Sequence, residues 1–250
     1  MNEGIQEGNA LLNNRKNKTP IVFDILLLGF VLFFSAIVIF YYYFAFSPIK
    51  GNSMLNTIEW GQSVLLKRHN YTLERGDIIT IDVPTDTENP HILIKRVVGL
   101  EGDKILFVRS EDNIYVDMYI CKAGSSNFEL AEEPYILERM KWEPKPDSEI
   151  YQKVSITEYI SAADITDIDI TKEYTDKDKK AIQKQITNAS YTVKSGEVFF
   201  LGDNRNNSND SRHYGSQPKN MIIGKVIKIF KENSSEEKFF RFLFNNYESA

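Results

Sequence analysis

The chain of 250 residues carries a net charge of −5 at pH 7 and a single cysteine, Cys121. This length fits one or two compact domains. The acidic balance argues against a nucleic-acid-binding protein, which would need a basic face. One cysteine excludes an intramolecular disulfide. The three histidines form no cluster with zinc-type spacing, so we expect neither a metal nor another cofactor.

An apolar segment follows the N-terminal residues. From Ile25 to Phe46, 22 consecutive residues carry no charge, and about 20 apolar residues suffice for a membrane-spanning helix. Tyrosines at 41–43 fall where an interfacial aromatic belt would lie. A cleaved signal peptide would have a shorter apolar core and small residues at its cleavage site. A buried core helix would rarely be so long and so apolar. We therefore interpret residues 21–46 as an uncleaved transmembrane anchor.

The basic residues before the anchor predict its orientation. Arg15, Lys16 and Lys18 precede it, and positively charged residues tend to stay on the cytoplasmic side. We expect a single-pass protein of the cell membrane, with residues 1–20 in the cytoplasm and the body after the anchor outside it.

The sequence after the anchor predicts a mainly β fold. Short apolar or alternating runs are separated by Gly, Pro, Asn and Asp, the pattern of an antiparallel body built from hairpins and bent strands. The predicted strands are 62–68, 77–83, 91–100, 104–109, 197–201 and 225–230. We assign 47–109 and 190–235 to a catalytic β body.

The middle of the chain has a different composition. Residues 111–180 contain 17 acidic and 9 basic residues, a net charge of −8. Together with a predicted helix at 176–188, this favours an inserted acidic lobe of mixed α and β structure at 110–189. Its aspartates lack the spacing of a calcium-binding loop and are read as a solvated face. Residues 236–250 form an aromatic tail, for which packing on the body is the first expectation and contact with lipid the second.

Ser53 is a candidate nucleophile or an ordinary loop residue. As a nucleophile it needs a base. His213 lies near Asp210 in the sequence, but closeness in sequence is poor evidence for a catalytic triad. In an extended strand Lys95 shares its face with apolar Leu93 and Val97, and burial there would lower its pKa. The alternative is a lysine that reaches solvent.

A polar segment at 202–215 is rich in Gly, Asp, Asn and Ser, whose side chains hydrogen-bond their own backbone in turns. Its charged residues can form pairs beneath a site, and Ser208 could hydrogen-bond and orient a neutral lysine. Without further context this segment would be a polar surface loop.

Three segments together resemble the motifs of type I signal peptidases, membrane-anchored serine proteases that remove signal peptides. Residues 53–58 resemble S-M-x-P-T-L, 95–103 match K-R-V-x-G-x-x-G-D, and 202–215 match G-D-N-R-x-x-S-x-D-S-R-x-x-G. Gly76-Asp77-Ile78 resembles a weaker motif. Asn56 departs from the family, which usually has proline there, and proline would stiffen the turn.

The resemblance implies the bent antiparallel β-sheet body of the signal peptidase type and a Ser-Lys dyad. Ser53 would be the nucleophile, Lys95 the general base and Ser208 its orienting partner, while Met54 would shape the substrate cleft. Scaffold residues would be Arg96, Asp203, Arg205, Asp210 and Arg212. None of these lies at 111–180, so we expect that region to be dispensable for chemistry but not for substrate choice or partners.

The resemblance also implies the partners. These are precursor proteins with signal peptides, the lipid bilayer and a nearby secretion translocon, with small residues at the first and third positions before the cut. Two alternatives remain open. One is a non-catalytic relative that assembles surface pili. The other is a self-cleaving, DNA-binding repressor, which the anchor and the lack of a basic N-terminal domain disfavour.

Overall fold

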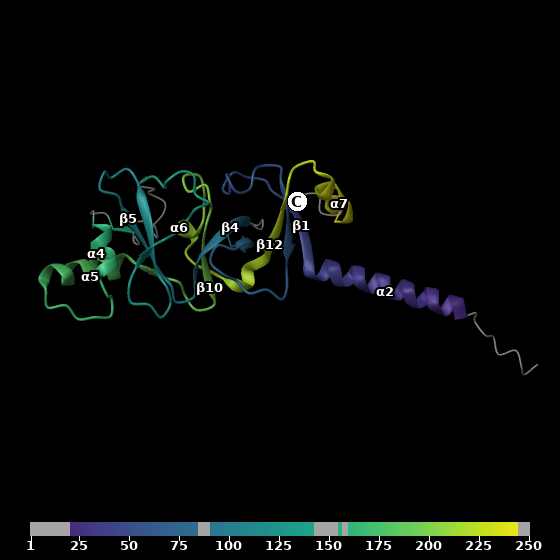
Figure 1. Ribbon diagram of the computed structural model, residues 1–250, viewed down its shortest axis with the longest axis horizontal. Helices are drawn as coiled ribbons and strands as arrows, with labels where there is room; N and C mark the ends of the chain where they lie inside the picture. Colours follow the sequence, from purple (N-terminus) through teal and green to yellow (C-terminus); the bar gives the residue numbers. More distant parts are fainter. Residues whose placement is uncertain (1–20, 85–90, 143–154, 157–159, 245–250) are drawn as a thin grey trace, which may run out of the picture. The chain divides into compact units, whose positions relative to one another are not determined.

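The computed structural model describes residues 21–84, 91–142, 155–156 and 160–244 (Figure 1). The chain divides into two compact units, Met1–Tyr43 and Phe44–Ala250. The cytoplasmic segment predicted at 1–20 lies outside the described residues.

The first unit contains helix α2 (Ile21–Tyr43), whose 23 residues have a mean hydropathy of 2.8 in the most apolar window and no buried side chain. A helix of this length extends about 34 Å, enough to cross a hydrocarbon core of about 30 Å. Length and composition therefore make α2 a candidate membrane span.

The predicted anchor ran to Phe46, but the helix ends at Tyr43 and strand β1 begins at Phe44. Phe46 is buried, and its ring stacks on Phe244 with 6.2 Å between the centroids. An uninterrupted apolar run does not distinguish the end of a helix from the start of a buried strand, so the sequence alone could not place this boundary.

The second unit holds a seven-stranded sheet in which all the neighbouring pairs are antiparallel. In spatial order its strands are β1 (Phe44–Pro48), β2 (Ser63–Lys67), β12 (Ile222–Phe230), β3 (Ile78–Val83), β4 (His91–Leu100), β10 (Glu197–Leu201) and β11 (Gln217–Pro218). Register shifts within β12 and β10 bend the sheet.

A second sheet of five strands is also largely antiparallel, and only the pairing of β5 with β8 is parallel. Its strands are β7 (Glu129–Leu130), β6 (Val116–Cys121), β5 (Lys104–Arg109) and β8 (Ser155–Ile156), with β9 (Tyr191–Thr192) paired to β5. A core cluster of side chains from β4, β5, β6 and β10, which includes Val98, Phe107, Met118 and Phe199, joins the two sheets.

The helices of this unit lie at its ends and in its connections. They are α4 (Ala162–Asp167), α5 (Lys177–Ala189), α6 (Ser211–Tyr214), the short 3₁₀ helix η1 (Lys219–Met221) and α7 (Ser235–Leu243). Figure 1 shows α4 and α5 at the end of the body that carries β5, and α7 at the end that carries β1.

The mainly β fold predicted from the sequence is confirmed, because each of the six predicted strands is present with boundaries within three residues. The predicted helix at 176–188 is α5, which begins after Asp176 because that side chain accepts hydrogen bonds from the backbone N–H groups of Asp178 and Lys179. The second sheet takes β5 and β9 from outside the segment predicted as an insertion, whose boundaries remain a prediction.

Candidate active site

Lys95 lies in the middle of β4 and is almost fully buried. Its register partner on β3 is Ile79, and both Ile79 and Val97 belong to the core, as strand alternation predicted. The Nζ atom donates to Ser53 Oγ at 2.7 Å and to the backbone carbonyl of Ile94 at 3.0 Å. The two residues predicted to react are therefore in hydrogen-bond contact.

The surroundings of Lys95 favour its neutral form. Burial, the largest effect, lowers the pKa of Lys95 from 10.5 to about 8. The negative charges of Asp210 and Asp203 oppose this shift, and the positive charge of Arg212 adds to it. A lysine with such a pKa is partly neutral near pH 8 and can accept a proton.

Ser53 lies in a tight turn whose backbone is held by its own hydrogen bonds. The N–H groups of Thr57 and Ile58 both donate to the carbonyl of Met54, at 3.0 and 2.8 Å. Asn56, which lies between Met54 and Thr57 in the chain, has φ of +82°, in the left-handed region that Gly and Asn tolerate best. Proline is fixed near −65°, so the residue that departs from the family pattern is compatible with this turn and proline is not.

Met54 was expected to shape a substrate cleft, but its side chain is only 1% exposed. It packs with Ile49, Ile58, Val64 and Leu66 in the cluster beneath the turn. Met54 therefore supports Ser53 from the core and presents no surface to a cleft, a difference that the motif alone could not reveal.

The segment 202–215 docks directly on the Ser53 turn. The backbone N–H of Asn204 donates to the Ser53 carbonyl at 3.0 Å, and the Asn204 side chain donates to the Asn52 carbonyl at 3.0 Å. Gly202 lies so close that a Cβ there would stand 2.5 Å from the Ser53 carbonyl oxygen and would also overlap Ser208. This close approach explains why position 202 carries no side chain.

Ser208 was predicted to orient Lys95 through a hydrogen bond. Its hydroxyl is buried against Gly202, but the described structure has no hydrogen bond between Ser208 and Lys95; the Nζ donates to Ser53 and Ile94. The structure thus brings Ser208 to the site without the expected contact.

Asp203 links the turn that contains Ser53 to β4 through hydrogen bonds. Arg96 donates to both of its carboxylate oxygens, at 2.9 and 2.5 Å, and Thr57 donates to the same carboxylate at 2.5 Å. Because Thr57 belongs to the turn of Ser53 and Arg96 follows Lys95, this network fixes Ser53 and Lys95 relative to each other. The sequence analysis assigned no role to Thr57.

Asp210 and Arg212 form a second buried pair, with Nε and Nη2 each 2.8 Å from a carboxylate oxygen. Burial by itself would raise the pKa of Asp210, but the charge and hydrogen bonds of Arg212 and the N–H of Gly202 lower it to about 2. The Asp210 carboxylate also accepts a hydrogen bond from the Gly202 N–H at 3.0 Å. The Asp210–Arg212 pair therefore holds Gly202 in place against the Ser53 carbonyl.

Two residues of the acidic middle region brace the candidate site. Glu133 accepts two hydrogen bonds from Arg205, at 2.6 and 2.5 Å, and Tyr135 donates to Glu133 at 2.9 Å. The guanidinium carbon of Arg96 lies 3.9 Å from the centre of the Tyr135 ring. The motifs did not predict these contacts, because neither residue falls in one of them. The contacts link region 111–180 to the candidate site, and whether the region is dispensable for chemistry stays a prediction.

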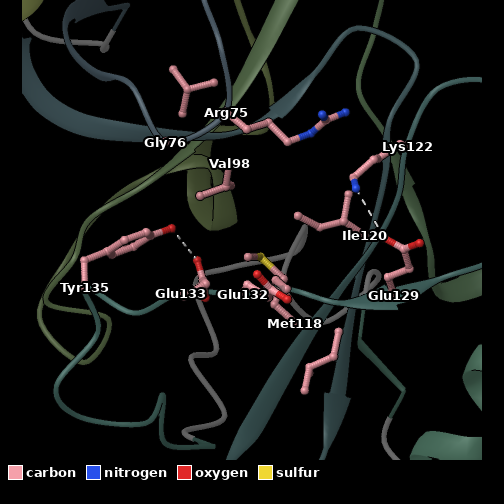
Figure 2. A pocket seen from close by; sticks show the side chains of 13 residues that line it. Arg75, Gly76, Val98, Met118, Ile120, Lys122, Glu129, Glu132, Glu133 and Tyr135 are labelled. Atoms are coloured by element: carbon pink, nitrogen blue, oxygen red, sulfur yellow. Dashed lines mark hydrogen bonds and ion pairs between the residues drawn. The ribbon is translucent and has the colours of Figure 1, made fainter.

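A cavity of about 470 Å³ lies next to this brace (Figure 2). Tyr135 and Glu133 line it, together with Gly76, Val98 and Met118. Figure 2 shows the Tyr135 hydroxyl directed at Glu133. Ser53 and Lys95 do not line the cavity, so the candidate catalytic pair lies outside it.

Within the described ranges, no three His, Cys, Asp or Glu side chains gather as metal ligands would. The site contains a serine hydroxyl hydrogen-bonded to a buried lysine amine, which is the geometry of a Ser-Lys dyad.

Comparison with known proteins shows the family of this chain. Residues 22–231 match the family described as signal peptidase, peptidase S26. The chain therefore belongs to the signal peptidase family, peptidase S26.

Individual relatives cover most of the chain. A signal peptidase I of Buchnera aphidicola from Schizaphis graminum is 30% identical over 229 residues, which are 78% of this chain and 70% of the relative. Signal peptidase I U of Bacillus subtilis is 28% identical over 225 residues, 88% of this chain and 91% of the relative. A signal peptidase I structure from Enterococcus faecalis matches with 22% identity and a TM-score of 0.32, covering 63% of this chain and 98% of that one.

Proposed function

We propose that this protein is a signal peptidase I, a membrane-anchored serine endopeptidase that removes signal peptides from exported precursor proteins. The observation that carries the proposal is the 2.7 Å contact between the buried Lys95 amine and the Ser53 hydroxyl. Membership of the signal peptidase family and the names of the relatives support the same reaction.

The reaction follows from the two side chains. Neutral Lys95 takes the Ser53 proton as Oγ forms a bond to the scissile carbonyl carbon. The resulting ammonium then gives a proton to the leaving amine as the peptide bond breaks. Water, deprotonated by the same lysine, releases the signal peptide from the acyl-enzyme.

The scissile carbonyl oxygen becomes negatively charged when Ser53 attacks, and this oxyanion needs hydrogen-bond donors. The backbone N–H of Ser53 is the candidate, and one such donor contributes about 3–4 kcal/mol to transition-state stabilisation. The hydrogen bond between Ser53 and Lys95 would be maintained by Thr57 and by the pairs Arg96–Asp203 and Arg212–Asp210. Ser208 would contribute by packing on Gly202 in the resting enzyme.

The membrane placement completes the proposal. Helix α2 would anchor the protein as a single span with the N-terminus in the cytoplasm, because Arg15, Lys16 and Lys18 precede it. Ser53 follows the helix by ten positions, so it would meet precursors where they emerge from the bilayer, near the secretion translocon. Small residues before the cut would define the preferred substrates.

Cleavage of a model precursor by the full-length protein tests the function. Ser53→Ala and Lys95→Ala should each abolish cleavage, whereas Ser47→Ala and Lys50→Ala, which change a nearby serine and an exposed lysine, should retain it. A wild-type protein without activity would favour the pilus-assembly alternative. An active Ser53→Ala protein would exclude the proposed dyad.

A further inference from the structure

Helix α7 presents two aromatic rings to solvent although it is firmly attached to the body. Phe239 is 58% exposed and Phe242 is 74% exposed. Residues three apart share one side of a helix, so the two rings form a single aromatic face. The helix lies outside residues 22–231, which match the signal peptidase family.

The opposite side of α7 is fixed by buried contacts. Phe240 packs on Phe230 of β12 with 5.0 Å between ring centroids, and Phe244, just after the helix, stacks on Phe46 of β1 at 6.2 Å. Buried Glu237 accepts a hydrogen bond from Ser63 of β2 at 3.0 Å. The exposure of the two rings is therefore a fixed feature of the folded body.

The chain itself indicates what covers this face. Phe46, on which α7 packs, follows Tyr43 by three positions, and Tyr43 is the last residue of the candidate membrane span. Aromatic rings are enriched at the membrane–water interface, and Lys238 beside Phe239 suits anionic headgroups. Trp60 is also 62% exposed, and the adjacent Gly61 lies against Glu232, just before α7.

We infer that α7 is an interfacial helix whose face of Phe239 and Phe242 enters the headgroup region of the bilayer. This inference rests on the proposed anchoring by α2. It assigns a second membrane contact to this chain, in addition to the span proposed for α2. The lipid contact holds whether or not the protein cleaves precursors.

Lipid quenching tests the contact directly. In the full-length protein with Trp60→Phe and Trp142→Phe, a single tryptophan is introduced by Phe242→Trp or, as a matched control, by Leu137→Trp. Leu137 is 73% exposed, like Phe242, but belongs to the acidic middle region. Both proteins are reconstituted in phosphatidylethanolamine–phosphatidylglycerol vesicles with brominated acyl chains. We expect strong quenching at position 242 and little at 137; equal quenching, or none at 242, would overturn the inference.

Activity gives an independent readout. The double variant Phe239→Ser/Phe242→Ser should cleave a vesicle-embedded precursor several-fold more slowly than the wild type and a short soluble peptide in detergent at the same rate. Leu137→Ser should change neither rate. Unchanged cleavage of the embedded precursor by the double variant would contradict the inference. If the wild type cleaved neither substrate, the proposed function would fail, and the quenching experiment would still decide the lipid contact.

Discussion

Glu133 and Arg205 are joined by two hydrogen bonds although 72 positions separate them in the chain. Arg205 belongs to the segment that docks on Ser53, and its guanidinium is buried. A buried charge that loses its partner is strongly destabilising. The acidic middle region is therefore tied to the candidate site by an ion pair whose arginine is buried.

We expect Glu133→Gln to lower the free energy of unfolding by about 3 kcal/mol, the lower end for breaking a buried pair, since Glu133 itself is partly exposed. The control is Glu132→Gln at the neighbouring exposed position, which should change the free energy of unfolding by less than about 0.5 kcal/mol. Chemical denaturation of the detergent-solubilised protein measures both. Equal values for the two variants would show that the pair does not stabilise the fold.

The pKa of Lys95 predicts how activity depends on pH. Only the neutral amine accepts the Ser53 proton, and burial lowers the pKa of this lysine to about 8. The value of kcat/KM for a short peptide should therefore rise with pH, reach half its maximum near pH 8 and level off above about pH 9. Lys95→Arg should be inactive, because arginine stays protonated. A profile still rising at pH 10, or an active arginine variant, would contradict a buried general base.

The same shift predicts a pH-dependent stability. The folded pKa lies below the unfolded value of 10.5. Between about pH 8 and 10.5 the unfolded chain therefore binds more protons at Lys95 than the folded protein, and stability rises with pH. Lys95→Met lacks this term, so the difference in unfolding free energy between the variant and the wild type should change by roughly 3 kcal/mol across that window. A difference independent of pH would mean that Lys95 titrates normally.

The left-handed backbone at Asn56 predicts the effect of restoring the family residue. Asn56→Pro cannot reach φ of +82° and should lose about 3 kcal/mol of stability together with cleavage activity, whereas Asn56→Gly should be tolerated. Asn113 also has a positive φ but lies far along the chain. Asn113→Pro should destabilise the protein and leave the activity of the folded fraction intact. A stable, active Asn56→Pro protein would show that the turn has another backbone conformation.

Local patterns predicted the strands well and the contacts between distant segments poorly. The alternation around Lys95 correctly predicted its burial, because the faces of a strand follow directly from the sequence. The end of α2 was placed three residues too late, because Phe44–Phe46 are as apolar in a strand as in a helix.

The motifs named the residues of the candidate site but not all of their contacts. Ser53 and Lys95 are in contact, whereas Met54 is turned into the core and Ser208 does not reach the lysine. Thr57, Glu133 and Tyr135 received no role in the sequence analysis, because a hydrogen bond between segments dozens of positions apart leaves no periodic signal. Their positions depend on how the two sheets pack.

The order of strands in the large sheet has a consequence for how the protein becomes a protease. Ser53 precedes β2 and Lys95 lies in β4, but β12, the last of the described strands, lies between β2 and β3. A sheet closed by such distant segments forms late, after long stretches of chain have been brought together. Because a chain is synthesised from its N-terminus, Ser53 and Lys95 are made well before β12. β12 is the strand that joins β2, which follows Ser53, to β3, which pairs with the Lys95 strand β4. Ser53 and Lys95 are therefore expected to come into contact only after β12 has been synthesised.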